Sequence, residues 1–317
     1  MGNYCYFCRE NRLIYNIKME IKTNSLKAWL LAARPKTLSA ALIPVMVAAA
    51  LAVHSPQCSW RALVICALFA SLMQIAANFI NDLYDFLKGT DRDDRLGPER
   101  ACAQGWITPK AMRWGIAVVL ILALICGALI LFFPQISNFR FQISMVALGA
   151  ACVVFAFLYT TILSYAGMGD LLVLLFFGFV PVCGTYFAAT GTLTGQAWLA
   201  GLTCGVLIDT LLIINNYRDR DTDRLSGKHT LIAVMGEKFG RYFYLFCGIA
   251  AWVLAWLFWH DHGLWPPLLT IPYIILHWLT WRQMVRIYEG KALNHILGLT
   301  SRNMLIFGLL LSIGLLL

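Results

Sequence analysis

The sequence predicts an all-α membrane protein in which nine transmembrane helices form a bundle. Three observations support this fold class: an apolar composition, long uncharged stretches, and basic residues that alternate with those stretches. Of the 317 residues, 60% are hydrophobic and only 13% are charged, whereas soluble proteins average about 25% charged residues. A chain of this composition is expected in lipid.

Uncharged stretches long enough to cross a membrane recur along the chain. Residues 114–133, 141–163 and 171–190 contain no Lys, Arg, Asp or Glu, and a transmembrane helix needs roughly twenty such residues. Six less regular segments complete the set. The nine predicted spans are 28–53, 61–86, 114–133, 141–163, 171–190, 196–217, 241–260, 265–285 and 298–317.

Lysine and arginine gather in alternate connecting segments, as expected for cytoplasmic loops. With the N-terminus in the cytoplasm, 23 of the 25 basic residues fall on the cytoplasmic side, and only Arg61 and Arg140 fall outside. This distribution supports the count of nine spans. The net charge of +9 is then a topology signal and an attraction to anionic membrane lipid, and it requires no nucleic-acid partner.

Residues 1–27 form a polar, basic N-terminal segment ahead of the transmembrane domain, residues 28–317. The segment lacks the apolar core and cleavage site of a signal peptide. Most of the ten cysteines lie in predicted spans as small apolar residues, so no disulfide framework is expected. Cys5 and Cys8 form one C-x-x-C without a second pair nearby, which is weak evidence for zinc.

Acidic residues concentrate at the predicted cytoplasmic ends of the second and sixth spans. Six of the 16 acids lie between Asp82 and Glu99, and four lie between Asp209 and Asp223. Because charge beside lipid is costly, its position carries functional information. An acid at a helix end can also simply mark the water boundary, but two matching clusters favour a site.

Both clusters share an Asn-x-x-x-Asp pattern whose spacing places three oxygen-bearing side chains on one helical face. These side chains are Asn78, Asp82 and Asp85 in the first cluster, and Asn215, Asp219 and Asp223 in the second. Carboxylates this close repel one another unless a cation lies between them, and oxygen ligands without His or Cys favour Mg²⁺. We predict that the four aspartates are catalytic and that all six residues bind Mg²⁺. The asparagines have an alternative role, which is hydrogen bonding between helices.

Basic residues near the acids predict a diphosphate site, because Lys and Arg neutralise phosphate oxygens. They are Arg34, Lys36, Arg92, Arg95, Arg224 and Lys228. A diphosphate beneath apolar helices indicates a lipid-tailed substrate, and polyprenyl diphosphate fits this description. Metal and basic side chains would stabilise the departing diphosphate and leave an allylic cation for an electron-rich ring to attack.

Five other polar residues are candidates for contact with the aromatic acceptor or the cavity: Asn81, Tyr84, Asp209, Asn216 and Tyr159. The tyrosine rings are suited to shield a carbocation. Asp209 lies two turns deeper than Asn216, which leaves two alternatives. It either lines the cavity, or it is a buried carboxyl that is protonated or paired.

These motifs resemble the UbiA superfamily of intramembrane prenyltransferases. The likeness extends from about residue 26 to the end and depends on paired Asn-Asp-x-x-Asp and Asp-x-x-x-Asp motifs on the second and sixth spans. Three segments look like the branch that prenylates 1,4-dihydroxy-2-naphthoate in menaquinone synthesis. They are Arg-Pro-Lys-Thr-Leu at 34–38, Asn-Asp-Leu-Tyr-Asp-Phe-Leu-Lys-Gly-Thr-Asp at 81–91, and Asn-Asn-Tyr-Arg-Asp-Arg-Asp-Thr-Asp at 215–223.

The resemblance implies a UbiA-like bundle in a bacterial inner membrane, with a central cavity open to the cytoplasm. It also implies Mg²⁺-dependent transfer of a polyprenyl group from polyprenyl diphosphate to 1,4-dihydroxy-2-naphthoate, with loss of CO2 and diphosphate, giving demethylmenaquinone. Two departures from the wider superfamily occur. Gly89 stands where a third acid is common, with Asp91 two residues later, and residues 159–170 lack a basic residue.

Other functions remain open at this point. A different acceptor, 4-hydroxybenzoate or haem, is the nearest alternative. Broken helices with acids at mid-bilayer would favour a cation-coupled transporter, whereas these acids cluster at one face and only Asp209 lies deep. A CDP-alcohol phosphatidyltransferase is disfavoured because no Asp-Gly-x-x-Ala-Arg stretch occurs. The sequence defines neither the prenyl chain length nor the oligomeric state.

Overall fold

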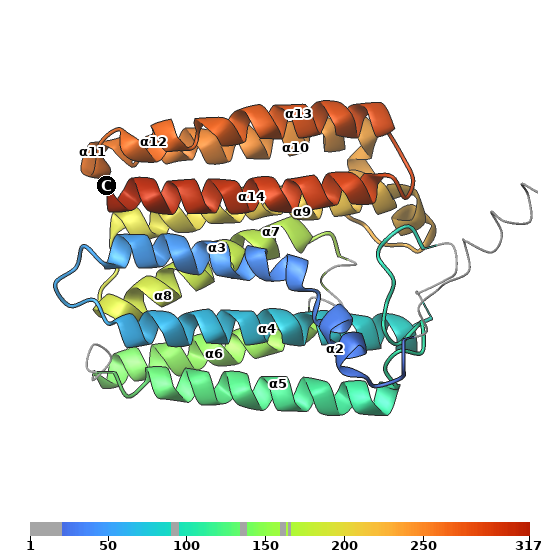
Figure 1. Ribbon diagram of the computed structural model, residues 1–317, viewed down its shortest axis with the longest axis horizontal. Coiled ribbons are helices and arrows are strands. Elements are labelled where there is room, and N and C mark those ends of the chain that lie inside the picture. Colours follow the sequence, from blue (N-terminus) through green and yellow to red (C-terminus); the bar gives the residue numbers. More distant parts are fainter. Residues whose placement is uncertain (1–20, 90–94, 134–137, 159–162, 164–165) are drawn as a thin grey trace, which may run out of the picture.

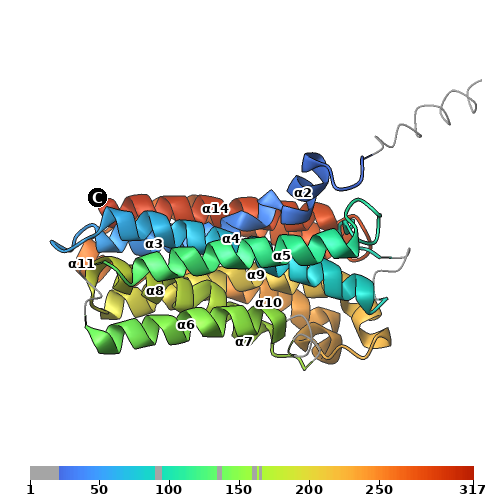
Figure 2. The same ribbon diagram turned by 90° about the horizontal axis from the view of Figure 1, so that it is seen from below.

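The computed structural model describes residues 21–89, 95–133, 138–158, 163 and 166–317. Within these ranges every regular element is a helix, which confirms the predicted all-α class. The long helices lie side by side with their axes roughly aligned, and the chain turns are gathered at the two ends of the bundle (Figures 1 and 2).

The elements follow one another along the chain in this order: α2 (Leu26–Ala33), α3 (Pro35–Ala52), α4 (Trp60–Leu87), α5 (Pro109–Ile130), α6 (Phe139–Leu158), α7 (Gly169–Val173), the π-helix η3 (Leu174–Phe179), α8 (Val180–Thr190), α9 (Gly195–Leu225), α10 (Leu231–Trp256), α11 (Trp259–His262), α12 (Trp265–Leu269), α13 (Ile271–Ile287) and α14 (Leu293–Leu316).

Eight of the nine predicted spans correspond to helical segments that are long and apolar enough to cross a membrane. The fifth of these combines α7, η3 and α8 into one segment, Gly169–Thr190. The chain is therefore a multi-pass membrane protein. Each segment contains a stretch of 18 residues with no more than two Asp, Glu, Lys or Arg, because charge is expensive in hydrocarbon.

The remaining predicted span, residues 265–285, is divided into α12 and α13. The division falls at Thr270, and Pro272 occupies the first turn of α13. A proline has no backbone N–H and cannot continue a preceding helix, but it suits a helix start. The two helices run along the bundle beside α10 and α14 (Figure 1), and the ninth crossing stays a prediction.

The first predicted span, residues 28–53, is wrong as one continuous helix. It is broken at Arg34, whose backbone has φ 52° and ψ 68° and lies between α2 and α3. Proline disfavours the helical conformation for the residue that precedes it, so Pro35 accounts for the break. The consequence is that Arg34 stands at a corner of the chain, at the same end of the bundle as the end of α4.

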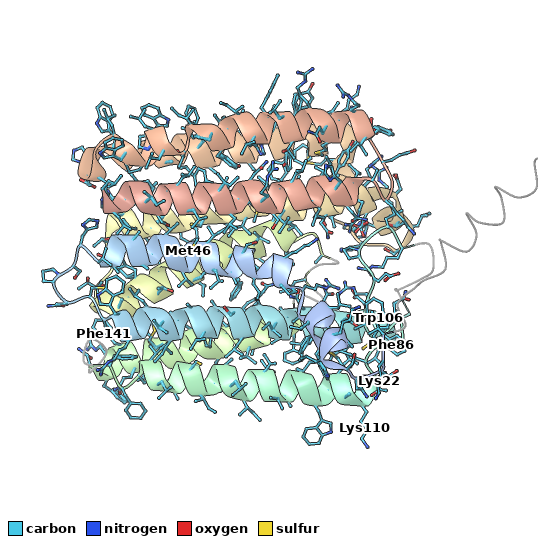
Figure 3. The ribbon with its side chains drawn as sticks, in the orientation of Figure 1. Lys22, Met46, Phe86, Trp106, Lys110 and Phe141 are labelled. Carbon is cyan, nitrogen blue, oxygen red and sulfur yellow. The ribbon has the colours of Figure 1, made fainter. Side chains whose placement is uncertain are left out.

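The largest apolar core lies among α3, α9 and α14, where Ile43, Leu207 and Phe307 are fully buried. In contrast, α6 has no buried residue, which is expected of a helix that faces lipid. Side chains project into the surroundings along the outer helices (Figure 3). Lys22, Trp106 and Lys110 lie at one end of the bundle, opposite to Phe141.

Glycines allow η3 to pack directly on the backbone of α9. A Cβ atom on Gly178 would lie 2.5 Å from the carbonyl oxygen of Gly201 and 2.8 Å from the Cα atom of Gly205. Small residues are typical where membrane helices approach closely. This contact holds the fifth span against the helix that carries the second acidic cluster.

We expect Gly178→Ala to lower the melting temperature of the detergent-solubilised protein, because the added methyl group meets backbone atoms. Overpacking of this kind costs about 1–3 kcal/mol. Gly149→Ala in α6 is the matched control, since a Cβ atom there meets nothing within 4 Å. Thermal unfolding measures both variants, and equal melting temperatures would show that the close contact between η3 and α9 is unnecessary.

Candidate active site

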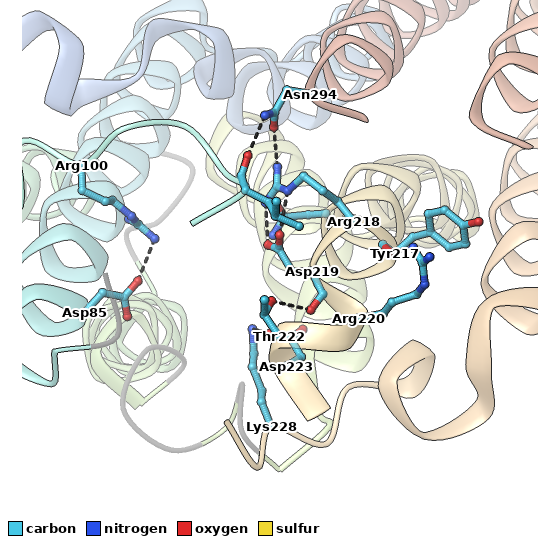
Figure 4. A network of polar contacts seen from close by, with 12 residues as sticks. Asp85, Arg100, Tyr217, Arg218, Asp219, Arg220, Thr222, Asp223, Lys228 and Asn294 are labelled. Carbon is cyan, nitrogen blue, oxygen red and sulfur yellow. Dashed lines mark hydrogen bonds and ion pairs between the residues drawn. The ribbon is translucent and has the colours of Figure 1, made fainter. Parts of the chain in front are cut away.

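Both acidic clusters lie at the same end of the bundle. The first belongs to the last turns of α4, and the second belongs to the last turns of α9. The segment from Arg95 to Thr108 follows α4 and passes near α9 and α14, as its contacts below show. Figure 4 shows this region from close by, with side chains of both clusters drawn.

Asp82 fastens the segment after α4 to the helix itself. Its carboxylate is 1% exposed and accepts hydrogen bonds from the backbone N–H groups of Ala101, at 2.8 Å, and Cys102, at 2.9 Å. Charge-assisted bonds of this type are among the stronger ones in proteins. Because each carboxylate oxygen can accept more than one bond, Asp82 retains capacity for a further ligand.

Asp85 is paired with Arg100, a residue that the sequence interpretation did not single out. The Arg100 Nη2 atom lies 2.7 Å from Asp85 Oδ2, and the Arg100 side chain is buried. Figure 4 shows this pair apart from the α9 cluster. The half-buried Asp85 carboxylate is neutralised by this pairing, so Arg100 acts as its internal counter-ion.

Arg34 lies close to this pair and completes a concentration of positive charge. The pKa of its guanidinium is lowered to about 9, chiefly by burial and also by the positive charges of Arg100 and Arg95, while the Asp82 and Asp85 carboxylates oppose the change. The group therefore remains charged at neutral pH. Its Nη2 atom is buried and has no hydrogen-bond partner among the described residues, which suits an anionic ligand.

Asn78 holds the corner that carries Arg34. Its Nδ2 atom donates to the carbonyl oxygen of Ala33 and to Thr37 Oγ1, both at 2.9 Å. Thr37 in turn donates to the carbonyl oxygen of Arg34 at 2.9 Å. These contacts match the alternative role of bonding between helices, and the role of Asn78 as a metal ligand stays a prediction.

The second cluster is organised around Arg218, which is only 3% exposed. Its guanidinium donates to Asn215 Oδ1 at 2.7 Å and to both carboxylate oxygens of Asp219, at 2.8 and 2.5 Å. The fourth acceptor atom is Asn294 Oδ1 on α14, at 2.8 Å (Figure 4). Two of the predicted metal ligands thus share one arginine, as Asp85 has Arg100.

Asn294 connects three parts of the site, and nothing in the sequence marked it. Its Nδ2 atom donates to the carbonyl oxygen of Leu96 at 2.7 Å, while its Oδ1 atom accepts from Arg218. A Cβ atom on Gly97 would approach the Arg218 guanidinium to 3.0 Å. The segment after α4 is therefore held against α9 and α14 at this point.

Asp223 ends the row on α9 and is 7% exposed. Lys228 lies 3.7 Å from its Oδ1 atom, and its Oδ2 atom is buried without a hydrogen-bond partner among the described residues. Arg224 instead pairs with Asp221 and donates to the carbonyl oxygen of Ala233. Of these two predicted diphosphate ligands, only Lys228 is paired with an acid of the predicted metal motif, Asp223.

The remaining predicted residues are distributed as follows. Lys36 is exposed, Asn81 is half-buried, and Asp209 and Asn216 are buried. The Tyr84 ring packs edge-on against Phe157, with 6.4 Å between ring centroids. Arg92 and Tyr159 lie outside the described residues, as does Asp91. Arg95 is near Arg34, as its effect on the Arg34 pKa shows.

The donor chemistry of the two clusters fits a hard divalent cation, since it consists of carboxylate and amide oxygens. The buried Oδ2 atom of Asp223 is an oxygen that a cation would satisfy. Among the described residues, no three acidic, histidine or cysteine side chains lie together as a metal-binding group. Asp82, Asp85 and Asp219 are instead hydrogen-bonded to donors of the chain itself, and Asp223 is paired with Lys228, so a metal would have to share or replace those partners.

A bundle of long apolar helices, with acids and arginines gathered at one of its ends, defines a class, the multi-pass membrane proteins. Residues 41–314 match the sequence profile of the UbiA prenyltransferase family. The chain belongs to this family, and the predicted resemblance is confirmed.

Similar proteins agree with this assignment. The chain is 30% identical to a 1,4-dihydroxy-2-naphthoate octaprenyltransferase of Haemophilus influenzae, with 92% of this chain and 96% of that protein covered. It is 31% identical to the Escherichia coli protein of the same name, with 91% and 94% covered. A solved structure of a UbiA homologue from Archaeoglobus fulgidus bound to GPP and Mg²⁺ shares the fold, with a TM-score of 0.61, 16% identity, and 90% and 99% covered.

We expect Asn294→Ala to increase hydrogen exchange of the backbone between residues 95 and 107, because the Leu96 carbonyl loses its donor. Asn138→Ala at the opposite end of the bundle is the control and should leave exchange in this segment unchanged. Hydrogen-exchange mass spectrometry of the full chain measures both. Unchanged protection in Asn294→Ala would mean that Asp82 alone holds the segment.

We also expect inorganic pyrophosphate with Mg²⁺ to stabilise the protein against heat, and Arg34→Gln to reduce this stabilisation at least by half. Removing a buried positive charge removes a charge-assisted bond to the anion. Arg140→Gln, at the opposite end, should behave as wild type. A thermal shift that is equal in all three proteins would place the anion elsewhere.

Proposed function

We propose that this protein transfers a polyprenyl group from polyprenyl diphosphate to 1,4-dihydroxy-2-naphthoate, with loss of CO2 and diphosphate, giving demethylmenaquinone in its quinol form. The observation that carries the proposal is that two Asp-rich helix ends lie at the same end of the bundle, the first of them beside the charged Arg34 guanidinium. Family membership and the names of the bacterial relatives support the reaction and the acceptor.

The proposed arrangement in the membrane follows the charge distribution. The nine predicted spans cross a bacterial inner membrane, with the N-terminus and both acidic clusters on the cytoplasmic side. A central cavity opens to that side, and the prenyl chain lies between the apolar helices. The path of α12 and α13 along the bundle supports the ninth crossing, and the basic residues near the clusters support the orientation.

The residues are assigned as the sequence suggested. Asp82, Asp85, Asp219 and Asp223 hold Mg²⁺, with Asn78 and Asn215 as supporting oxygens. Mg²⁺, when bound, neutralises diphosphate oxygens and so favours departure of the leaving group. The diphosphate is bound by basic residues at the same end of the bundle: Arg34, Lys36, Arg92, Arg95, Arg224 and Lys228.

The chain contributes to the reaction by charge and by exclusion of water. Arg34 offers a buried, charged donor to the leaving diphosphate, and donors already fixed by the fold cost no reorganisation when charge develops. Arg100 and Arg218 lie against the acids and keep them in place until substrate arrives. Tyr84 and Tyr159 are the rings proposed to shield the allylic cation until the acceptor ring attacks.

The acceptor is tested by the mass of the product. Purified protein is incubated with a prenyl diphosphate and with dihydroxynaphthoate, 4-hydroxybenzoate or haem in separate reactions. We expect a prenylated product that has lost CO2 from dihydroxynaphthoate alone. Product formation only with 4-hydroxybenzoate or haem would assign another activity of the same family. Absence of product with every acceptor, together with ion uptake into vesicles, would favour a transporter.

Alanine at Asp82 or at Asp219 is expected to abolish turnover while the protein still inserts into the membrane. Loss of a residue that binds the metal and diphosphate should reduce the rate at least 100-fold, a typical effect of one electrostatic group. Membrane fractionation and the melting temperature report insertion and folding. Asp261→Ala at the opposite end is the control, and wild-type turnover in either site variant would disprove the assignment.

A further inference from the structure

A small pocket lies beside the second acidic cluster, between the start of α7 and the end of α9. It is lined by Gly167, Gly169, Asp170, Leu212, Asn216, Lys228 and Thr230. At one edge the chain passes so closely that a Cβ atom on Gly167 would lie 2.4 Å from the carbonyl oxygen of His229. The pocket has a volume of about 10 Å³, which is room for one water-sized group.

A buried carboxyl lies next to this pocket and has no evident structural role. Asp209 is 6% exposed, and its Oδ1 atom has no hydrogen-bond partner among the described residues. It is close enough to Asp170, which lines the pocket, for their two charges to repel. A buried polar atom without a partner is costly, and an acid pair inside a bundle indicates function.

The helical geometry connects this acid pair with the proposed diphosphate site. Asp209, Asn216 and Asp223 are seven residues apart on α9 and so lie on one face of it. At 1.5 Å per residue, Asn216 is about 10 Å along the helix from each of the two aspartates. Lys228 lines the pocket and also lies 3.7 Å from Asp223. The pocket therefore adjoins the site where the prenyl diphosphate is proposed to bind.

We propose that Asp170 accepts a hydrogen bond from a ring hydroxyl of the aromatic acceptor and takes its proton during transfer, and that Asp209 is a positioning residue behind it. The inference depends on the proposed function. A hydroxyl is a water-sized group, so it suits the pocket, and Asn216 and Lys228 supply further polar contacts.

The proposed step balances. Asp170 takes the hydroxyl proton, and the electron pair of the O–H bond moves into the ring. The ring carbon that carries the carboxylate bonds to carbon one of the prenyl group, while the carbon–oxygen bond to diphosphate breaks and its electron pair leaves with the diphosphate. The bond to the carboxylate then breaks, CO2 departs, and the ring oxygen recovers the proton from Asp170.

The test combines side-chain variants with acceptors in which one hydroxyl is methylated. Full-length wild type, Asp170→Asn and Asp209→Asn are assayed with dihydroxynaphthoate and with each of its two monomethyl ethers. Asp261→Asn at the opposite end is the matched control. We expect Asp170→Asn to lower kcat/KM for the acceptor about 100-fold, with the KM for prenyl diphosphate changed less than threefold.

The decisive comparison is the penalty for methylation. In wild type, kcat/KM with one of the two ethers should fall as far below that with dihydroxynaphthoate as Asp170→Asn falls below wild type. In Asp170→Asn, the same ether should lower kcat/KM little further. Asp209→Asn should lower kcat while retaining part of that penalty, because its carboxylate acts through Asp170. An equal penalty in wild type and Asp170→Asn would overturn the inference, as would wild-type activity in Asp170→Asn.

Folding and the acceptor's identity are controlled separately. Should Asp170→Asn fail to fold, judged by its melting temperature and gel filtration, Asp170→Ser replaces it in the same comparison. If wild type uses 4-hydroxybenzoate instead, the proposed function fails, and the comparison with that acceptor and its methyl ether still decides the role of Asp170. If no phenolic acceptor is prenylated, both proposals are wrong.

Discussion

The exclusion of charge from the hydrocarbon core is the constraint on which the rest of this structure depends. Long apolar helices occupy the membrane, so most of the ionisable side chains are confined to the helix ends. Acids and bases are therefore crowded together at the end of the bundle where α4 and α9 finish. Crowding of like charges requires counter-ions, and the fold supplies them from its own arginines and lysine.

The counter-ions form a repeated arrangement. Asp85 has Arg100, Asp219 has Arg218, and Asp223 has Lys228. Such pairs keep the acids in place. In the proposed reaction these acids would hold the metal ion, and the basic partners would contact the diphosphate.

The sequence was sufficient for the features that depend on local pattern. Apolar stretches of about twenty residues predicted eight of the spans, and the pattern of acids predicted that both clusters lie at one end of the bundle. The break at Arg34 had a local signal as well, since Pro35 follows it, but a long apolar stretch outweighed that signal in the prediction. The division of α12 from α13 likewise follows from Pro272, although the apolar composition of residues 265–285 predicted one span.

What could not be predicted depends on contacts between distant parts of the chain. Arg218 and Asn294 are 76 positions apart, and no spacing rule connects them. Asp170 lies near Asp209 because α7 and η3 both pack against α9, which is a property of the folded backbone. Arg100 pairs with Asp85 because Asp82 holds the backbone at Ala101, so its position follows from a hydrogen bond that periodicity does not reveal.

The central claim is that the ends of α4 and α9 bind one diphosphate together. Its most direct test is the calorimetric titration of the purified protein with an unreactive prenyl thiodiphosphate in the presence of Mg²⁺. The account predicts a single binding site per chain, weakened strongly by Asp85→Asn or by Asp223→Asn, with the double variant little worse than either one. Two independent binding events, or losses that add in the double variant, would contradict it.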